Sequence, residues 1–348
     1  MSQPNSSALP GQTAAPFMEM AEGPAMEPAL AICAVRCLPG ATGIANLRRL
    51  SGGASQETWA FEALMPAGPL PLILRRMPNV PPRANVPGPE TEARVIVRAA
   101  AAGVPAPEIH HVLEPVDGLG RGYIMGFVAG ETIARKILRD AAFANVRPRL
   151  ARRCGEVLAL IHAIDLDEVR PLRATTVGES LATSYESYKA QGMARPAFEL
   201  AFRWLKDNAP ADATPRLIHG DFRHGNLIIS PYDLAAVIDW EGVRIGDPME
   251  DLGWICVNSW RFGNLDNPVG GFGAREEMFA GYEAAGGPAV DPARVHFWET
   301  FGTLRWGMIC AGMAREFQAG DRSVERATIG RRASETEIDL LRLLLPRG

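Results

Sequence analysis

Several absences narrow what this chain can be. Its 348 residues carry 36 Lys and Arg against 40 Asp and Glu, so no basic excess is available to neutralise a nucleic-acid backbone. The longest apolar run near the N-terminus, 28–35, is too short to cross a bilayer and follows no basic segment. We therefore expect a cytoplasmic protein that binds neither nucleic acid nor membranes.

Cysteine is also scarce. The five cysteines are odd in number and mostly isolated, which predicts reduced thiols rather than a disulfide framework. Only Cys33 and Cys37 lie close in sequence, and two cysteines without nearby partners predict no zinc site.

Hydrophobic patterning predicts strands first and helices afterwards. A flexible tail at 1–27 precedes a short helix at 29–38, strands at 58–63 and 70–77, a helix at 90–102 and a strand at 123–128. The later helices are expected at 146–164, 196–208, 275–285, 295–317 and 334–345. This order predicts an α+β chain in two lobes, a small β-rich N-lobe at 28–128 and a larger, mostly helical C-lobe at 129–348.

The segment from His219 to Asn226 places polar and glycine positions between two apolar runs. An apolar strand at 234–238 then leads to Asp239, so we expect these polar groups at the mouth of one hairpin. Phosphoryl transfer needs a group that orients and deprotonates the attacking hydroxyl, and hard oxygen ligands for magnesium. Asp221 suits the first role, and Asn226 and Asp239 suit the second.

The spacing from Asp221 to Asn226 is that of the D-x-x-x-x-N catalytic loop of kinases. Such a pair in isolation more often caps a turn. Its conjunction with His219-Gly220, the flanking apolar runs and Asp239 favours the catalytic interpretation.

With these residues and the segments IDWE at 238–241 and GDPMEDLG at 246–253, the chain resembles the aminoglycoside phosphotransferase family, whose relatives include choline and homoserine kinases. The resemblance implies a protein-kinase-like fold that uses ATP and Mg²⁺. It also implies that Asp221 is the catalytic base, with Asn226 and Asp239 as metal ligands. Glu241 lies two residues beyond Asp239, and would reach a second metal ion if the strand continues. The alternative is that Glu241 is a solvated surface carboxylate.

Several neighbouring residues are expected to support this loop. The resemblance puts His219 behind the loop, hydrogen-bonded to backbone so that it fixes Asp221, and it implies that Asp251 supports the loop in the same way. Asp247 and Glu250 suit the N-cap and N3 positions of a helix start. His162 lies on an apolar helix and is interpreted as a core histidine with satisfied hydrogen bonds.

A glycine-rich turn at 51–56 is the expected phosphate loop of the N-lobe. Gly52 and Gly53 let backbone amides approach phosphate oxygens, and Ser55 follows them. Gln56 stands where the family usually has Asn, which leaves its contact with phosphate in doubt.

The strand at 70–77 is the expected cofactor strand. Kinases supply a lysine here, but no lysine precedes Lys136 in this chain. Ile73 and Arg75 share a face, so Ile73 can cover adenine while Arg75 replaces the lysine at the phosphates. Arg76 points the other way, and we expect it in solvent.

Two further segments resemble parts of a kinase nucleotide site. Glu92 resembles the helix carboxylate that pairs with the phosphate-binding cation, with Glu90 as a competitor. The run at 123–128 resembles the hinge that binds adenine, and its Met125 and Phe127 are candidates for adenine contact or for plain core.

Two alternatives to a small-molecule kinase remain. His219, Asp221, His224 and Asp239 suit a metal-dependent hydrolase. The substitutions at Arg75 and Gln56 suit a nucleotide-binding pseudokinase.

The acceptor is expected to be a small-molecule alcohol. Acids and arginines are nearly balanced from residue 275 onward, which argues against a polycationic aminoglycoside. The apolar and arginine content of 295–315 is compatible with a neutral or anionic metabolite, such as an acyl thioester or another lipid-pathway compound.

Overall fold

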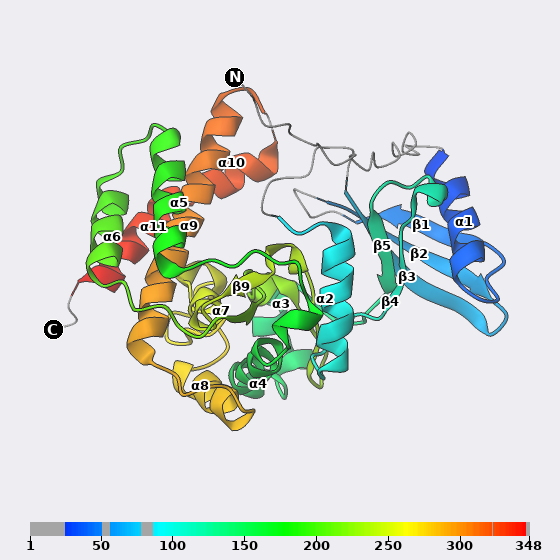
Figure 1. Cartoon of the computed structure of the whole chain (residues 1–348), viewed down its shortest axis with the longest axis horizontal. Coiled ribbons are helices and arrows are strands. Elements are labelled where there is room, and N and C mark those ends of the chain that lie inside the picture. Colours follow the sequence, from blue (N-terminus) through cyan, green and yellow to red (C-terminus); the bar gives the residue numbers. More distant parts are fainter. Residues whose placement is uncertain (1–24, 51–55, 78–85, 322, 346–348) are drawn as a thin grey trace, which may run out of the picture. The chain divides into compact units, whose positions relative to one another are not determined.

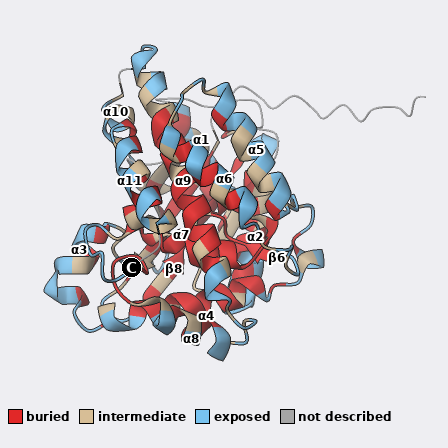
Figure 2. Cartoon of the chain, turned by 90° about the vertical axis from the view of Figure 1, so that its left-hand side faces the viewer, coloured by how far each residue is buried: buried red, intermediate tan, exposed pale blue. Residues whose placement is uncertain are grey.

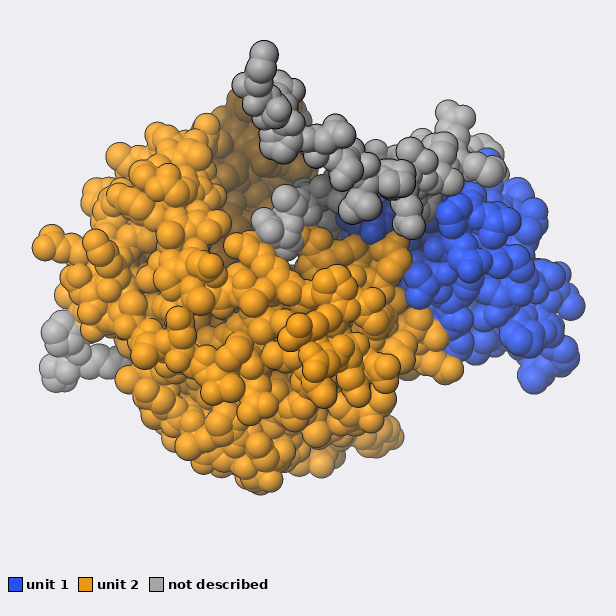
Figure 3. Space-filling view, in the orientation of Figure 1, with its two compact units in different colours: residues 1–81, 110–125 blue, residues 82–109, 126–348 orange. Residues whose placement is uncertain are grey.

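The computed structural model describes residues 25–50, 56–77, 86–321 and 323–345 (Figure 1). The chain divides into two compact units, one from residues 1–81 and 110–125 and the other from 82–109 and 126–348 (Figure 3). The division assigns the helix at 89–101 to the larger unit, whereas the sequence had assigned it to the N-lobe. The chain passes between the units at 81/82, 109/110 and 125/126, and the last of these crossings lies within the segment expected to be the hinge.

The first unit is built on a five-stranded sheet, in the order β1-β2-β3-β5-β4. Its elements are α1 (Met26–Cys37), β1 (Ile44–Arg49), β2 (Glu57–Met65), β3 (Gly68–Arg76), β4 (Ile109–Val112) and β5 (Gly122–Gly126). β2 pairs antiparallel with both β1 and β3. Leu30 of α1 shares a core with Leu72 and Leu74 of β3, so the helix covers one face of the sheet.

Helix α1 begins at Met26, three residues before the start expected from the sequence. Met26 is buried against Leu30 in the same core, and this apolar contact accounts for the extra turn. The expectation that residues 26 and 27 belong to a flexible tail is therefore wrong. Residues 1–24 lie outside the described residues.

The second unit is mainly helical. Its helices are α2 (Pro89–Ala101), α3 (Ala134–Arg139), α4 (Leu150–His162), α5 (Val177–Ala190), α6 (Pro196–Asp207), α7 (Met249–Ile255), α8 (Arg275–Ala284), α9 (Pro292–Gln318), α10 (Val324–Gly330) and α11 (Ala333–Leu344). The five helices predicted after residue 129 are all present, with ends shifted by up to four residues. Helix α5 was not predicted. Its buried side chains are Val177 and Tyr188, near its two ends, so the helix lacks a clear apolar periodicity.

Helix α9 is the centre of this unit. It packs against α6, α7, α10 and α11, and α4 packs against α8. Figure 2 shows that buried residues concentrate along α9, α7 and α4. In the described part of the chain, no helix combines the length and the apolar character needed to span a membrane.

Two short antiparallel pairs carry the polar segments. Strand β6 (Arg216–Ile218) pairs with β9 (Arg244–Gly246), and β7 (Leu227–Ile229) pairs with β8 (Leu234–Val237). The loops between these strands contain all the residues expected to act in catalysis.

Candidate active site

The β7–β8 hairpin brings Asn226 and Asp239 to one end. Leu227 faces Val237 across the ladder, and the Ile238 N–H donates to the Asn226 carbonyl oxygen at 3.0 Å. Asn226 precedes the first strand and Asp239 follows the second after one residue. The sequence expectation that both lie at the mouth of a single hairpin is confirmed.

Asp239 has a left-handed backbone, with φ 67° and ψ 62°. This region costs energy for residues other than glycine, although Asp tolerates it better than most. The next residue, Trp240, is fully buried and donates its indole N–H to the Val237 carbonyl at 3.1 Å. This anchor holds the turn that redirects Asp239 out of the strand.

Three side chains hold the carboxylate of Asp221. Arg223 Nε donates to its two oxygens at 3.0 and 3.2 Å. Asn226 Nδ2 donates to Oδ2 at 2.7 Å, and Trp254 Nε1 donates to Oδ1 at 2.8 Å. Because a quarter of the side chain (25%) stays exposed, the carboxylate is oriented but still accessible.

His219 is a scaffold for this loop. The Asp221 N–H donates to its Nδ1 at 3.2 Å, and its Nε2 lies 3.1 Å from the Ile238 carbonyl oxygen. These contacts assign a neutral ring with the proton on Nε2. Burial lowers the pKa of His219, in agreement with that assignment. The ring thus ties the backbone of Asp221 to the residue before Asp239.

Asp251 supports the same loop from α7, as expected. Its Oδ2 accepts the His219 N–H at 2.7 Å, and its Oδ1 accepts the Gly220 N–H at 2.8 Å. Burial disfavours the charged carboxylate, but hydrogen bonds from His162 and the loop outweigh it and lower the pKa of Asp251. The two loop amides therefore face a buried anion.

His162 is a core histidine with both nitrogens satisfied. Its Nε2 lies 3.1 Å from Asp251 Oδ2, and its Nδ1 lies 2.9 Å from the Tyr282 hydroxyl. The core interpretation is confirmed. The structure adds that His162 holds the carboxylate behind the loop, a role without a local sequence signal because its partner lies on a distant helix.

Gly220 cannot be replaced without moving the loop. Its φ is 77°, and a Cβ at this position would overlap the Gly242 carbonyl oxygen and the Arg244 guanidinium. The loop therefore needs glycine both for its conformation and for its close approach to the 240–242 turn.

Two arginines stack on tryptophans beside Asp221. The Arg223 guanidinium lies 4.9 Å from the centroid of the Trp260 ring, and that of Arg305 lies 4.3 Å from Trp254. The two tryptophan rings are themselves 5.3 Å apart. Such stacking holds a guanidinium in one orientation while keeping its charge.

Arg305 also connects α9 to the catalytic loop. It donates to the Gly220 carbonyl oxygen at 3.1 Å and to Glu250 at 2.9 Å. Arg244 forms a second ion pair with Glu250. Sequence reasoning missed these roles, because only the fold brings α9 beside the loop.

The predicted helix start at Asp247 is partly right. Asp247 Oδ1 accepts the Met249 N–H at 3.0 Å, while Oδ2 accepts from Trp298 Nε1 and Arg294 Nε, each at 2.6 Å. Glu250 does not serve the helix start, because its carboxylate pairs with Arg244 and Arg305. Asp247 is architectural, as expected.

The argument for Glu241 as a second metal ligand is wrong in its premise. Strand β8 ends at Val237, and Glu241 lies in a 3₁₀ turn at Trp240–Gly242. Asp239 and Glu241 therefore do not share a strand face. A metal role for Glu241 stays a prediction.

The metal centre required by the hydrolase alternative does not form. His224 is buried between Phe262 and Phe272, with Nδ1 2.7 Å from the Gly270 carbonyl oxygen. Burial lowers the pKa of His224 to about 4. Among the described residues, the clusters of metal-ligating groups contain neither His224 nor Asp221. Both ring nitrogens of His219 contact the backbone, at the Asp221 N–H and the Ile238 carbonyl oxygen, so neither is available to a metal.

On the cofactor strand β3, Ile73 and Arg75 lie on the face away from α1, since Leu72 and Leu74 face its core. Arg75 Nε donates to Gln56 Oε1 at 2.6 Å. The two residues that depart from the family pattern are thus partners of each other. Gly52, Gly53 and Ser55 lie outside the described residues.

The expectation that Arg76 is solvated is wrong. Its side chain is 3% exposed and pairs with Glu57 at 2.9 Å. It also reaches the Leu119 carbonyl oxygen at 3.5 Å. A guanidinium whose donors meet a carboxylate and a carbonyl can stay charged in this buried position.

The remaining candidates of the nucleotide site are divided between the units. Met125 is buried in β5, while Phe127 lies beyond the strand and is 46% exposed, so it is not core. Glu92 is buried on α2, a helix that packs against the 240–242 turn. Glu92 and Arg75 belong to different units, and their pairing stays a prediction.

Residues 46–288 match the model of the phosphotransferase enzyme family. The chain belongs to this family, and its predicted resemblance to aminoglycoside phosphotransferases is confirmed.

Solved structures show the same fold. A Ralstonia eutropha protein assigned to the aminoglycoside phosphotransferases aligns with a TM-score of 0.72 at 22% identity, over 91% of this chain and 97% of that one. A choline/ethanolamine kinase family protein from Mesorhizobium loti gives 0.62 at 22% identity, over 92% and 94%. A mutant of aminoglycoside phosphotransferase APH(4)-Ia, solved with AMP-PNP and hygromycin B, gives 0.61 at 19% identity, over 90% and 98%. The predicted two-lobed kinase-like α+β fold is thereby confirmed.

Curated relatives carry a different name. Acyl-CoA dehydrogenase family member 10 of Mus musculus is 26% identical over 77% of this chain, and family member 11 of Gallus gallus is 28% identical over 83%. The chain spans only 27% and 40% of the length of these two relatives.

Proposed function

We propose that this protein is an ATP- and Mg²⁺-dependent phosphotransferase that moves the γ-phosphate to a hydroxyl of a small molecule, with Asp221 as the base. The observation that carries the proposal is the oriented carboxylate of Asp221, hydrogen-bonded to Asn226 at the end of the hairpin that also carries Asp239. Family membership supports the reaction class.

The reaction follows from the protein's own groups. The acceptor oxygen attacks the γ-phosphorus while the bond to the β,γ-bridging oxygen breaks, so ADP leaves and a phosphate ester forms. The hydroxyl proton passes to a carboxylate oxygen of Asp221. Because Arg223 and Trp254 hold the other positions around this carboxylate, it does not need to reorient during the transfer.

Asn226 and Asp239 fit a magnesium ion by the chemistry of their donors. The amide nitrogen of Asn226 donates a hydrogen bond to Asp221 at 2.7 Å. Its amide oxygen is therefore the atom that can bind a hard cation. Asp239 adds a carboxylate from the left-handed turn. Magnesium, when bound, neutralises charge on the phosphate oxygens.

We place the nucleotide contacts on β3 of the first unit. Ile73 and Arg75 share a face there, and Gln56 holds the Arg75 guanidinium in one orientation. A fixed guanidinium can clamp phosphate with two N–H donors. The AMP-PNP complex of a protein with the same fold supports a nucleotide as the phosphate donor.

We infer that the acceptor is a neutral or anionic alcohol of the acyl-thioester class. The guanidinium groups of Arg223 and Arg305 pair with the carboxylates of Asp221 and Glu250, which weakens the attraction that these acids would offer to a polycationic aminoglycoside. The curated relatives are named for acyl-CoA, which favours an acyl thioester. The matched segment covers 27% and 40% of the length of these two relatives.

A screen tests the proposal directly. Purified protein with ATP and Mg²⁺ is offered hydroxyacyl thioesters, free hydroxy acids, choline and aminoglycosides, and ADP release is measured. We expect turnover with a hydroxyacyl thioester and its loss in Asp221→Asn. The matched control is Asp266→Asn, an exposed carboxylate in the same unit, which should keep wild-type turnover.

Two outcomes would contradict parts of this proposal. Turnover only with aminoglycosides would overturn the acceptor class and leave the base assignment intact. ATP binding without turnover of any acceptor in the screen would favour the pseudokinase alternative.

A further inference from the structure

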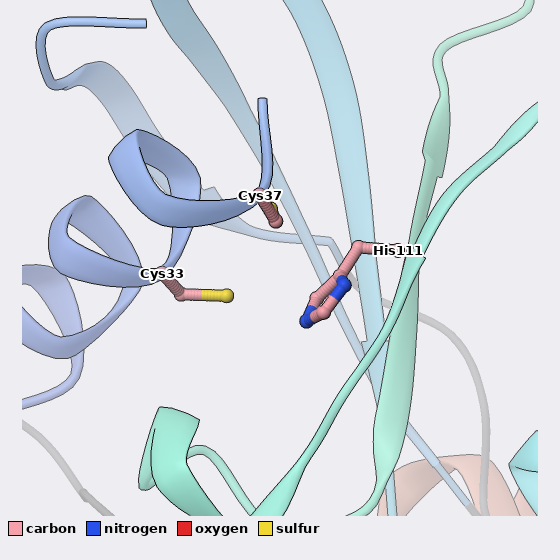
Figure 4. Close-up of side chains that lie close together, drawn as sticks. All are labelled: Cys33, Cys37 and His111. Carbon is pink, nitrogen blue, oxygen red and sulfur yellow. The ribbon is translucent and has the colours of Figure 1, made fainter. Parts of the chain in front are cut away.

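A second cluster of reactive side chains lies in the first unit. Cys33 and Cys37 stand one helical turn apart on α1, and His111 projects from β4 into the same space (Figure 4). One ring nitrogen of His111 and the two sulfur atoms lie within 4.8 Å of one another. The sequence predicted no zinc site because the cysteines had no nearby partner. The sheet supplies that partner from a distant strand.

A buried carboxylate adjoins the cluster. His111 Nε2 lies 3.0 Å from Asp117 Oδ2, and the side chain of Asp117 has no exposed surface. Burial disfavours its charge, but hydrogen bonds from the Glu114 N–H and from His111 outweigh it and lower the pKa of Asp117 to about 2. Glu114 itself is less suited as a ligand, because its side chain is 57% exposed and pairs with Arg36.

These contacts distinguish the cluster from ordinary buried cysteines. A free cysteine commonly packs as a small apolar residue, and Cys154, Cys256 and Cys310 do so in the other unit. Packing alone gives no reason to gather an imidazole and a carboxylate beside two thiols. Two sulfurs, a nitrogen and an oxygen are a donor set that proteins use for zinc.

We propose that Cys33, Cys37, His111 and Asp117 bind a zinc ion. The spacing of four residues on a helix puts both sulfurs on one face. The other two ligands come from β4 and the 3₁₀ turn at Pro115–Asp117. Zinc bonds of about 2.0–2.3 Å would draw the ligand atoms closer together than they lie now, and Asp117, which groups with His111 and Glu114 rather than with the two sulfurs, would have to move the most.

The charges of this site balance. Two thiolates, one carboxylate and Zn²⁺ sum to a single negative charge, and Arg36 Nη2 lies 2.7 Å from Asp117 Oδ1 to offset it. Binding releases the two thiol protons to solvent and replaces the His111–Asp117 hydrogen bond with two coordinate bonds. No oxidant or reductant is involved.

Four protein ligands leave no open coordination position, so this zinc is structural. It would link α1 to the β4 edge of the sheet. Helix α1 is otherwise held by the apolar core that Leu30 and Cys33 share with β3 and β5. The proposal does not depend on the proposed function.

The test uses the full chain stripped of metal by a chelator under reducing conditions and titrated with Co²⁺. We expect one Co²⁺ per chain, with thiolate-to-cobalt charge-transfer absorption that zinc removes by displacement. The oxygen ligands Asn226 and Asp239 produce no such band, so the catalytic site does not interfere.

Variants with matched controls locate the ligands. Cys37→Ser and His111→Asn should lose the charge-transfer band, and Asp117→Asn should weaken zinc binding by more than the roughly 10- to 100-fold typical of a residue that only contacts a ligand. Cys310→Ser and His110→Asn should keep it. Circular dichroism shows whether each variant is folded. Cys37→Ser is preferred to Cys33→Ser, because Cys37 is only partly buried and its replacement should disturb folding less.

Three results would overturn the proposal. One is a reduced wild-type chain that shows no thiolate band with Co²⁺. Another is a band that persists when both Cys33 and Cys37 are replaced by Ser. The third is a Cys33–Cys37 disulfide in place of retained metal when reductant is removed in the presence of zinc, which would reassign the pair to redox chemistry.

Discussion

The catalytic loop and the cofactor strand reach order by different means. In the loop, almost every polar group is held by a partner from the same unit, down to the buried pair of Asp251 and His162. On β3, Arg75 Nε donates to Gln56 Oε1 at 2.6 Å, a contact between the two residues that depart from the family pattern. We therefore expect substitutions in the loop to have larger effects than substitutions on the strand.

The largest expected effect is on the loop. Asp221→Asn should lower kcat by about 10²–10⁴-fold, the usual contribution of a general base. ATP affinity should change by less than about threefold, since the base interacts with the acceptor. Steady-state turnover and nucleotide titration measure the two quantities, with Asp266→Asn as the control. A kcat within tenfold of wild type would remove Asp221 as the base.

The second largest effect is expected from Asp251, which supports the catalytic loop. Asp251→Ala removes the acceptor of the His219 and Gly220 amides and leaves buried donors without partners. We expect the free energy of unfolding to fall by about 2–5 kcal/mol, measured by urea denaturation. Asp266→Ala should change it by less than about 0.5 kcal/mol. A small loss for Asp251→Ala would show that the loop is less dependent on its support than the contacts indicate.

Acid should destabilise the larger unit through His224. Burial lowers its pKa from 6.5 to about 4, so the unfolded chain binds this proton first as pH falls. The stability contributed by neutral His224 is present above about pH 6.5 and is lost progressively down to about pH 4, on the order of 3 kcal/mol in total. Urea denaturation across this range should give a shallower pH dependence for His224→Gln. Equal slopes would mean that the imidazole stays accessible to protons.

The cofactor strand should respond more mildly. Arg75→Ala should raise the KM for ATP by about tenfold, because one phosphate-binding cation is lost. Gln56→Ala should have a smaller effect, acting through the orientation of Arg75. A double-mutant cycle on KM should show coupling of about 0.5–1.5 kcal/mol. Additive effects would mean that Gln56 does not act through Arg75, and the comparison between loop and strand would lose its basis.

Arg75→Lys tests whether the charge of Arg75 or the shape of its guanidinium group matters for ATP binding. The variant restores the lysine that kinases use at this position. A lysine ammonium lacks the planar set of N–H donors with which a guanidinium can bind Gln56 and a phosphate at the same time. We expect it to recover only part of the affinity for ATP lost in Arg75→Ala. Full recovery would show that charge alone matters at this position.

What could be predicted depended on where the signals lay along the chain. Asn226 and Asp239 flank one hairpin, and His219 to Asp221 directly precede it, so their convergence followed from local pattern. Arg305 and Trp254 lie on helices far along the chain, and no local spacing indicated that they would meet the loop. The strand-face argument for Glu241 failed because β8 ends at Val237, before Asp239.

The sequence by itself determined the class of this protein, since a catalytic motif is a short run whose spacing survives in the fold. It also determined the longer helices of the second unit other than α5, and the strands β2, β3 and β5, through hydrophobic period. Only the tertiary structure decided which polar groups are partners. Arg76 is buried rather than solvated, and His162 supports Asp251. Cys33 and Cys37 meet His111, which in turn contacts Asp117. The reason is physical: a buried polar group must find a partner in space, and most such partners here lie far away in sequence.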